Sequence, residues 1–132
     1  MEESSSKGQK SCEERVDEHL KSRIADLEEF IENGDIEGLQ DYHLWFDYVN
    51  EEEEEPYFRY QLSTGGPGDE FRFFCDHAFR PYRVEYWFLD WYDGANRILS
   101  GRDKDVLVKV WERLFGEPEY LRRIIERDIN DL

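Results

Sequence analysis

The side chains most suited to acid–base chemistry are carboxylates in the second half of the chain. A general acid and a general base can be a pair of carboxylates, with an arginine beside them to orient the substrate. The candidates for such a site are Asp69, Glu70, Asp90 and Asp93, together with Arg72 and Arg83. Asp and Glu make up 33 of the 132 residues, so carboxylates that lie close together are expected without catalysis. We therefore predict structural ion pairs, Asp90 included, and no enzymatic activity.

A second group of reactive side chains is the tripeptide Cys75-Asp76-His77. Cysteine and histidine bind metals, but a closed site needs about four ligands and neighbouring residues of one strand supply two at most. A cysteine nucleophile needs an oriented imidazole, and no residue visible around His77 would orient it. We predict no metal centre, no covalent catalysis and no cofactor.

The uneven distribution of charge is the most informative feature of the sequence. Residues 1–55 contain 19 Asp and Glu against 5 Lys and Arg, whereas residues 56–132 contain 14 against 12. The formal net charge is -16, and the first 55 residues supply nearly all of it. Such a surface attracts cationic partners and repels nucleic acid and anionic membranes. We expect a basic protein partner and no membrane binding.

Two acidic segments form the candidate binding surface. One is the polar face of a predicted helix, and the other is a run of five glutamates that precedes Pro56. Carboxylates fixed on these segments would imitate the phosphates of a duplex, which carries one charge per about 1.7 Å of axis. The residues predicted to bind the partner are Glu14, Asp17, Glu18, Glu28, Glu29, Glu32, Glu51, Glu52, Glu53, Glu54 and Glu55.

Aromatic residues that alternate with arginines are also found in proteins that stack nucleic-acid bases. The arginines of this pattern are Arg59, Arg72, Arg80 and Arg83. A net charge of -16 opposes the attraction to phosphate that supplies most of such affinity. We therefore expect no direct binding to DNA or RNA.

An amphipathic helix is predicted to carry the first acidic segment. Ser11 and Glu14 have the spacing of a capping box, and Asn33-Gly34 ends the helical pattern. Apolar residues recur at spacings of three and four between these limits, which is typical of a helix with one buried face. That face contains Val16, Leu20, Ile24, Leu27 and Ile31. A polar connection from Gly34 to Asp41 is expected to follow.

Alternation of apolar and polar residues then predicts an antiparallel meander. The expected strands span residues 42–48, 57–63, 71–75 and 82–91, with a short fifth strand at 97–99. The glutamate run at 51–55 repels itself and is expected to be an exposed hairpin loop. Gly65-Gly66-Pro67-Gly68 lacks the lysine of a phosphate-binding loop and is interpreted as a turn. Because the fourth strand is apolar on both sides, we expect helices to cover its second face.

Two C-terminal helices complete the predicted α+β fold. Ser100 or Asp103 caps the first, which runs to Leu114, and the second spans roughly 119–130. Residues 11–132 are expected to form a single domain with a four- to five-stranded sheet, an N-terminal helix and two C-terminal helices. Residues 1–10 lack apolar periodicity and are predicted to be a disordered tail.

The sequence contains no pattern that directs the chain to a membrane. No stretch approaches the roughly 20 apolar residues of a membrane span, and residues 1–10 lack the apolar centre of a signal peptide. Cys12 and Cys75 are far apart in the sequence and are interpreted as free thiols. These observations predict a cytoplasmic protein.

Four segments of the predicted sheet region resemble segments of other small proteins. They are Tyr60-Gln61-Leu62-Ser63, Gly65-Gly66-Pro67, Asp69-Glu70-Phe71-Arg72-Phe73 and Glu85-Tyr86-Trp87-Phe88-Leu89-Asp90-Trp91. With them, the region from Tyr42 to Leu114 resembles small uncharacterised acidic proteins of plasmids and other mobile elements. The resemblance brings no established activity or residue roles, and its setting implies an accessory or counter-defence factor.

The function that these patterns favour is non-catalytic inhibition. The protein would block a basic surface of a nuclease or another DNA- or RNA-binding protein, as a nucleic-acid mimic. An immunity protein or antitoxin that binds a basic toxin is the alternative. In a third interpretation, the protein is a small domain of unrelated function, and its acidity is an adaptation to high salt. The aromatic surplus leaves a homodimer open as well.

Overall fold

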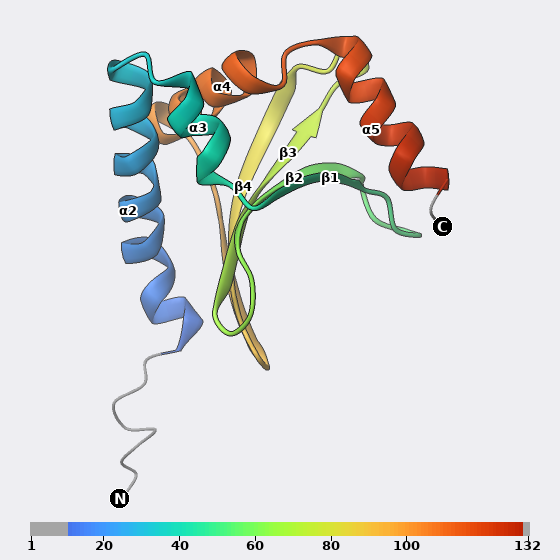
Figure 1. Ribbon diagram of the computed structural model, residues 1–132. Coiled ribbons are helices and arrows are strands. Elements are labelled where there is room, and N and C mark those ends of the chain that lie inside the picture. Colours follow the sequence, from blue (N-terminus) through green and yellow to red (C-terminus); the bar gives the residue numbers. More distant parts are fainter. Residues whose placement is uncertain (1–10, 131–132) are drawn as a thin grey trace, which may run out of the picture.

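A five-stranded antiparallel sheet with the strand order β1-β2-β3-β4-β5 forms the centre of the molecule (Figure 1). The computed structural model describes residues 11–130, so the expected tail at 1–10 lies outside the described residues. The expected α+β class, the meander, the N-terminal helix and the two C-terminal helices are confirmed. The elements are α2 (Cys12–Glu32), α3 (Ile36–Tyr42), β1 (Trp45–Val49), β2 (Tyr57–Ser63), β3 (Gly68–Cys75), β4 (Pro81–Asp90), β5 (Asp93–Ile98), α4 (Gly101–Leu114) and α5 (Pro118–Asn130).

The capping box at the start of α2 is present in both directions. The Glu14 backbone N–H donates to the Ser11 hydroxyl at 3.2 Å, and the Ser11 backbone N–H donates to the Glu14 carboxylate at 2.9 Å. These bonds satisfy backbone donors that a helix start otherwise leaves free. The helix ends at the predicted position, where Asn33 is the C-cap. Its buried face contains Cys12, Val16, Leu20, Ile24 and Leu27.

A short helix, α3, replaces the predicted polar connection. The Asp35 side chain caps it by accepting from the Gly38 backbone N–H at 2.8 Å, and Leu39 is fully buried. Tyr42 belongs to this helix, so the prediction that the first strand starts there is wrong; β1 starts at Trp45. Seven residues with one buried side chain are too short to show a helical period.

The first face of the sheet holds the core. The strand register aligns Phe58 with Phe73 and Phe73 with Val84, and it aligns Phe71 with Tyr86. Helix α4 packs here through Trp111, whose ring centroid lies 4.9 Å from that of Phe73. Figure 1 shows the helices arranged around this side of the curved sheet. Antiparallel sheets often bury one face in this way.

The prediction that helices cover the second face is wrong. The side chains on that face cover one another instead, because arginines extend across aromatic rings. The Arg72 guanidinium carbon lies 3.9 Å from the ring centroid of Trp87 and 4.7 Å from that of Tyr57. The Arg83 carbon lies 3.9 Å from the ring of Phe74, which is only 5% exposed. Long arginine stems can bury apolar surface while their charged ends stay hydrated.

Helix α5 protects the outer edge of β1. The Tyr48 backbone N–H donates to Asp128 at 2.7 Å, and Arg127 donates to the Phe46 carbonyl at 3.1 Å. An open sheet edge offers unpaired backbone groups to other chains. The two side chains of α5 therefore satisfy groups that could otherwise pair with a second strand.

A buried ion pair joins α2 to the sheet. Arg23 donates to both oxygens of Asp69, at 2.7 and 2.9 Å, and Asp69 is 3% exposed. The Ser63 and Tyr86 hydroxyls donate to the same carboxylate. Burial acts to raise the pKa of Asp69, but these hydrogen bonds outweigh it and lower the pKa below its ordinary value. Arg23 also donates to the Tyr42 hydroxyl at 3.0 Å, which brings α3 into the cluster.

Replacement of Arg23 by alanine tests this connection. We expect R23A to lower the free energy of unfolding by about 3–5 kcal/mol at neutral pH, because Asp69 stays buried without its cation. The lowered folded-state pKa of Asp69 means that the ion pair contributes fully above its unfolded pKa of about 3.9 and is lost as the pH falls below that value. Urea unfolding at several pH values measures both effects.

The control is K21A, on the exposed side of the same helix, which should change the stability by less than about 0.5 kcal/mol. Two results would contradict the role of the Arg23–Asp69 ion pair in stability. One is an R23A variant as stable as K21A, and the other is a loss of unfolding free energy in R23A that does not become smaller at acid pH.

Candidate functional site

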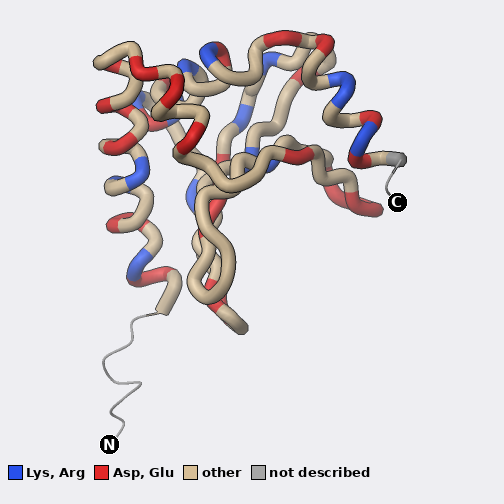
Figure 2. Tube along the Cα trace, viewed as in Figure 1, with Lys and Arg blue, Asp and Glu red and all other residues tan. Residues whose placement is uncertain are grey.

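The eleven predicted binding residues lie in two separate places. Six belong to α2, and the other five form the loop between β1 and β2. Helix α2 contacts β4 and β5, at the far side of the sheet from β1. Figure 2 shows the two groups of acidic residues on opposite sides of the molecule. The structure therefore provides two acidic surfaces and not one continuous array.

Three of the six α2 carboxylates have structural partners. Glu14 belongs to the capping box, and Asp17 accepts from Arg97 of β5 at 2.9 Å. Glu28 forms an ion pair with Arg102 of α4. The two ion pairs connect residues 80 and 74 positions apart, so no local sequence pattern indicated them.

The other three, Glu18, Glu29 and Glu32, are exposed and form no ion pair within the described part of the chain. A helix rises 1.5 Å per residue with 3.6 residues per turn, so residues 18 and 29 lie on the same side about 16 Å apart. Glu32 follows about one turn later on that side. We call these three residues the α2 acidic stripe. Its spacing is wider and less regular than that of duplex phosphates.

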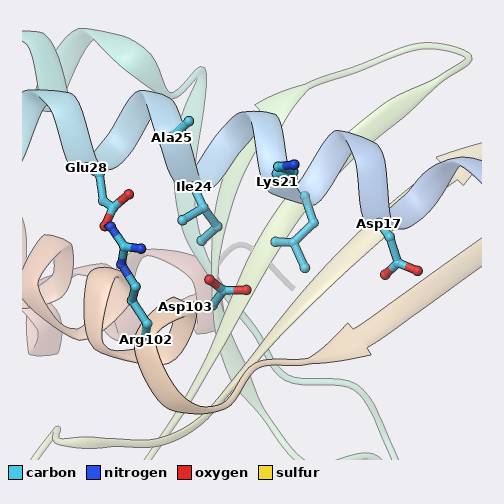
Figure 3. Close-up of a pocket in the computed structure, with 8 residues that line it drawn as sticks. Asp17, Lys21, Ile24, Ala25, Glu28, Arg102 and Asp103 are labelled. Carbon is cyan, nitrogen blue, oxygen red and sulfur yellow. The ribbon is translucent and has the colours of Figure 1, made fainter.

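A pocket of about 460 Å³ lies beside the stripe, between α2 and α4. Its apolar wall consists of Leu20, Ile24 and Ala25 of α2, and charged side chains surround it. Figure 3 shows the Glu28 carboxylate and the Arg102 guanidinium pointing toward each other at one end. The remaining charged residues of the lining are Asp17, Lys21 and Asp103. An apolar wall edged by charged side chains of both signs can receive a segment that carries both apolar and charged side chains.

The β1–β2 loop is the second acidic surface. All five glutamates from Glu51 to Glu55 are exposed, as the sequence predicted. Glu55 forms an ion pair with Arg83 at 2.8 Å, and the other four have no such pair among residues 11–130. Glu53 adopts a left-handed backbone conformation with φ of 68°.

The carboxylates proposed for acid–base chemistry are used by the fold. Asp90 forms the predicted ion pair, with Arg15 at 2.7 Å, and Glu70 pairs with Arg72 at the same distance. Asp93 accepts from the Cys12 backbone N–H at 2.8 Å, and this hydrogen bond lowers the pKa of the Asp93 carboxyl. Each group therefore has a structural role that sequence spacing alone did not define.

Both cysteines are free thiols, as predicted. Burial raises the pKa of the Cys75 thiol to about 12, with a further contribution from Asp76, and burial also raises that of Cys12. His77 is exposed in the turn after β3. In the portion of the chain that the structure describes, no group of three or more His, Cys, Asp or Glu side chains is placed to hold a metal ion.

A second, smaller pocket contains a histidine with an unpartnered ring nitrogen among the described residues. His43 has a buried Nδ1 atom without a hydrogen-bond partner among the described residues, and its ring stacks on Tyr60 with centroids 4.7 Å apart. Burial lowers the pKa of His43. The pocket measures about 180 Å³, and Glu117 and Tyr120 also line it. A histidine in a loop carries no sequence signal for such a position.

Comparison of the chain with protein-family models, curated proteins and solved structures finds no match. Among the described helices, none is long and apolar enough to cross a membrane.

The two thiols provide a test of the site chemistry. We expect iodoacetamide to label Cys12 and Cys75 on the order of 100-fold more slowly in the folded protein at pH 8 than in the urea-unfolded chain, because both thiols stay protonated and Cys12 is inaccessible. Mass spectrometry of the labelled peptides measures each site separately. Labelling of Cys75 at the unfolded rate would instead identify an activated thiol.

Proposed function

We propose that this protein is a non-catalytic acidic binding protein that blocks a basic surface of a nuclease or another nucleic-acid-binding protein. One observation carries the proposal: most arginines form ion pairs within the molecule, whereas many carboxylates form none. Nine of the twelve arginines form ion pairs among the described residues. The negative charge of the α2 acidic stripe and of residues 51–54 is left without local compensation.

The same pairing argues against direct binding to nucleic acid. The four arginines of the aromatic pattern each have a carboxylate partner: Arg59 with Asp47, Arg72 with Glu70, Arg80 with Asp76, and Arg83 with Glu85. An arginine held by a carboxylate offers little net attraction to phosphate. The sheet face therefore favours contact with a protein over contact with DNA or RNA.

The proposed mechanism is steric and stoichiometric. The α2 acidic stripe would attract the basic surface, and the pocket between α2 and α4 would receive side chains at its edge. Fixed carboxylates accelerate association with a basic partner, and salt weakens that effect because the exposed charges are screened within about 10 Å at 0.1 M. Binding would prevent nucleic acid from reaching the same surface.

The proposal places the protein in the cytoplasm, where such targets act. Two free thiols fit a reducing compartment. The resemblance to proteins of mobile elements is consistent with a counter-defence role. A basic toxin would present a similar surface, and identification of the captured partner separates the two classes.

A capture experiment tests the proposal. The intact chain, immobilised at low salt, should recover a DNA- or RNA-binding protein that added salt or competing duplex releases. E18Q/E29Q/E32Q should recover at least about fivefold less of it, because the variant lacks the unpaired charges of α2. Quantitative mass spectrometry of the eluates measures the difference.

The matched control is E112Q/E119Q/E126Q, which removes three exposed glutamates from α4 and α5 and changes the net charge equally. It should recover the partner as the intact chain does. Equal recovery by all three proteins would show that the acidity serves solvation, and the proposal would fail.

A further inference from the structure

The turn between β4 and β5 carries the two most exposed aromatic side chains among residues 11–130. Trp91 is 81% exposed and Tyr92 is 103% exposed. Asp90 and Asp93 pair with each other across the strands, so Trp91 and Tyr92 alone make the connection. Such turns usually contain Asn, Gly or Asp, whose backbones tolerate the bend. Turn formation therefore does not explain why two large aromatic residues occupy this position.

The turn is held in place by α2. Asp90 accepts from Arg15 at 2.7 Å, and Asp93 accepts from the Cys12 backbone N–H at 2.8 Å. The β2–β3 loop lies at the same end of the sheet, where a Cβ atom added to Gly66 would come within 2.6 Å of the Trp91 indole nitrogen. The indole thus rests against a glycine that leaves room for it. An anchor held in its binding position loses less entropy when a partner arrives.

The charges around this turn favour a cation. Glu13 and Asp17 of α2 hold Arg97 of β5 at 2.7 and 2.9 Å, and Arg15 is bound to Asp90. The arginines nearest the turn are therefore already paired. Asp93 accepts only from an uncharged backbone N–H, so the four carboxylates in these contacts outnumber the two arginines and leave the surroundings of the turn negative. A lysine or arginine over an aromatic ring is attracted by the ring's negative face, and tryptophan binds it best.

We propose that Trp91 and Tyr92 form an aromatic anchor that receives an arginine or lysine side chain of the basic partner. This inference rests on the proposed function and extends it to a second contact point. Trp, Tyr and Arg dominate the binding energy of protein interfaces, where a few anchored side chains decide affinity. We expect salt to weaken the contact between the anchor and a cation less than it weakens attraction by the exposed carboxylates.

Titration with an oligo-arginine peptide tests the anchor. We expect W91A/Y92A to weaken binding at low salt about fivefold relative to the intact chain, from the loss of cation–π contacts. The control Y82A/I98A removes two other exposed apolar side chains and should bind within about twofold of the intact chain. Calorimetry measures affinity, and the indole N–H signal of Trp91 should shift in NMR spectra while that of buried Trp111 does not.

The outcomes separate this inference from the proposed function. If E18Q/E29Q/E32Q weakens peptide binding but W91A/Y92A does not, the anchor is wrong and the proposed function stands. Failure of the intact chain to bind the peptide would contradict both. If W91A/Y92A instead converts a dimer to a monomer in analytical ultracentrifugation, a second copy occupies the turn and the inference is overturned. Thermal unfolding of W91A/Y92A should match that of the intact chain, because both side chains are largely exposed.

Discussion

The contact between Arg23 and Asp69 determines how the acidic helix is presented. It fixes α2 against β3, and the hydroxyls of Tyr86 and Ser63 complete the coordination of the buried carboxylate. Tyr42 brings α3 to the same guanidinium. A buried ion pair is costly to form but costs more to break, so it fixes the position of the elements it joins. The outward side of α2, with its unpaired glutamates, is oriented as a consequence.

Most arginines form ion pairs that hold elements of the fold together, whereas a surplus of carboxylates stays exposed to solvent. Arginines cover the second sheet face, hold the β4–β5 turn and connect α4 to α2. Because the carboxylates outnumber these cations, charge remains on the α2 acidic stripe and on the β1–β2 loop. These two acidic surfaces lie on opposite sides of the molecule, so one small partner surface cannot contact both at once. In the proposed function the principal contact therefore falls on α2, which also adjoins the larger pocket and the aromatic turn.

Periodic segments were predictable from the sequence, and contacts between distant segments were not. The strand at Tyr57–Ser63 was predicted with its observed bounds, and the capping box fixed the start of α2. Trp91 was predicted in the fourth strand because it continues an apolar alternation, yet it lies in the turn. Glu18 and Glu28 look alike in the sequence. Arg102, on another helix, forms an ion pair with Glu28 and forms none with Glu18.

The most direct test of the central claim is displacement of nucleic acid. A labelled duplex bound to the captured partner is titrated with the intact chain, and fluorescence anisotropy follows the release of the duplex. The proposed mechanism predicts complete release near one equivalent, because both ligands use one basic surface. A stable ternary complex, in which the duplex stays bound at saturating protein, would contradict it.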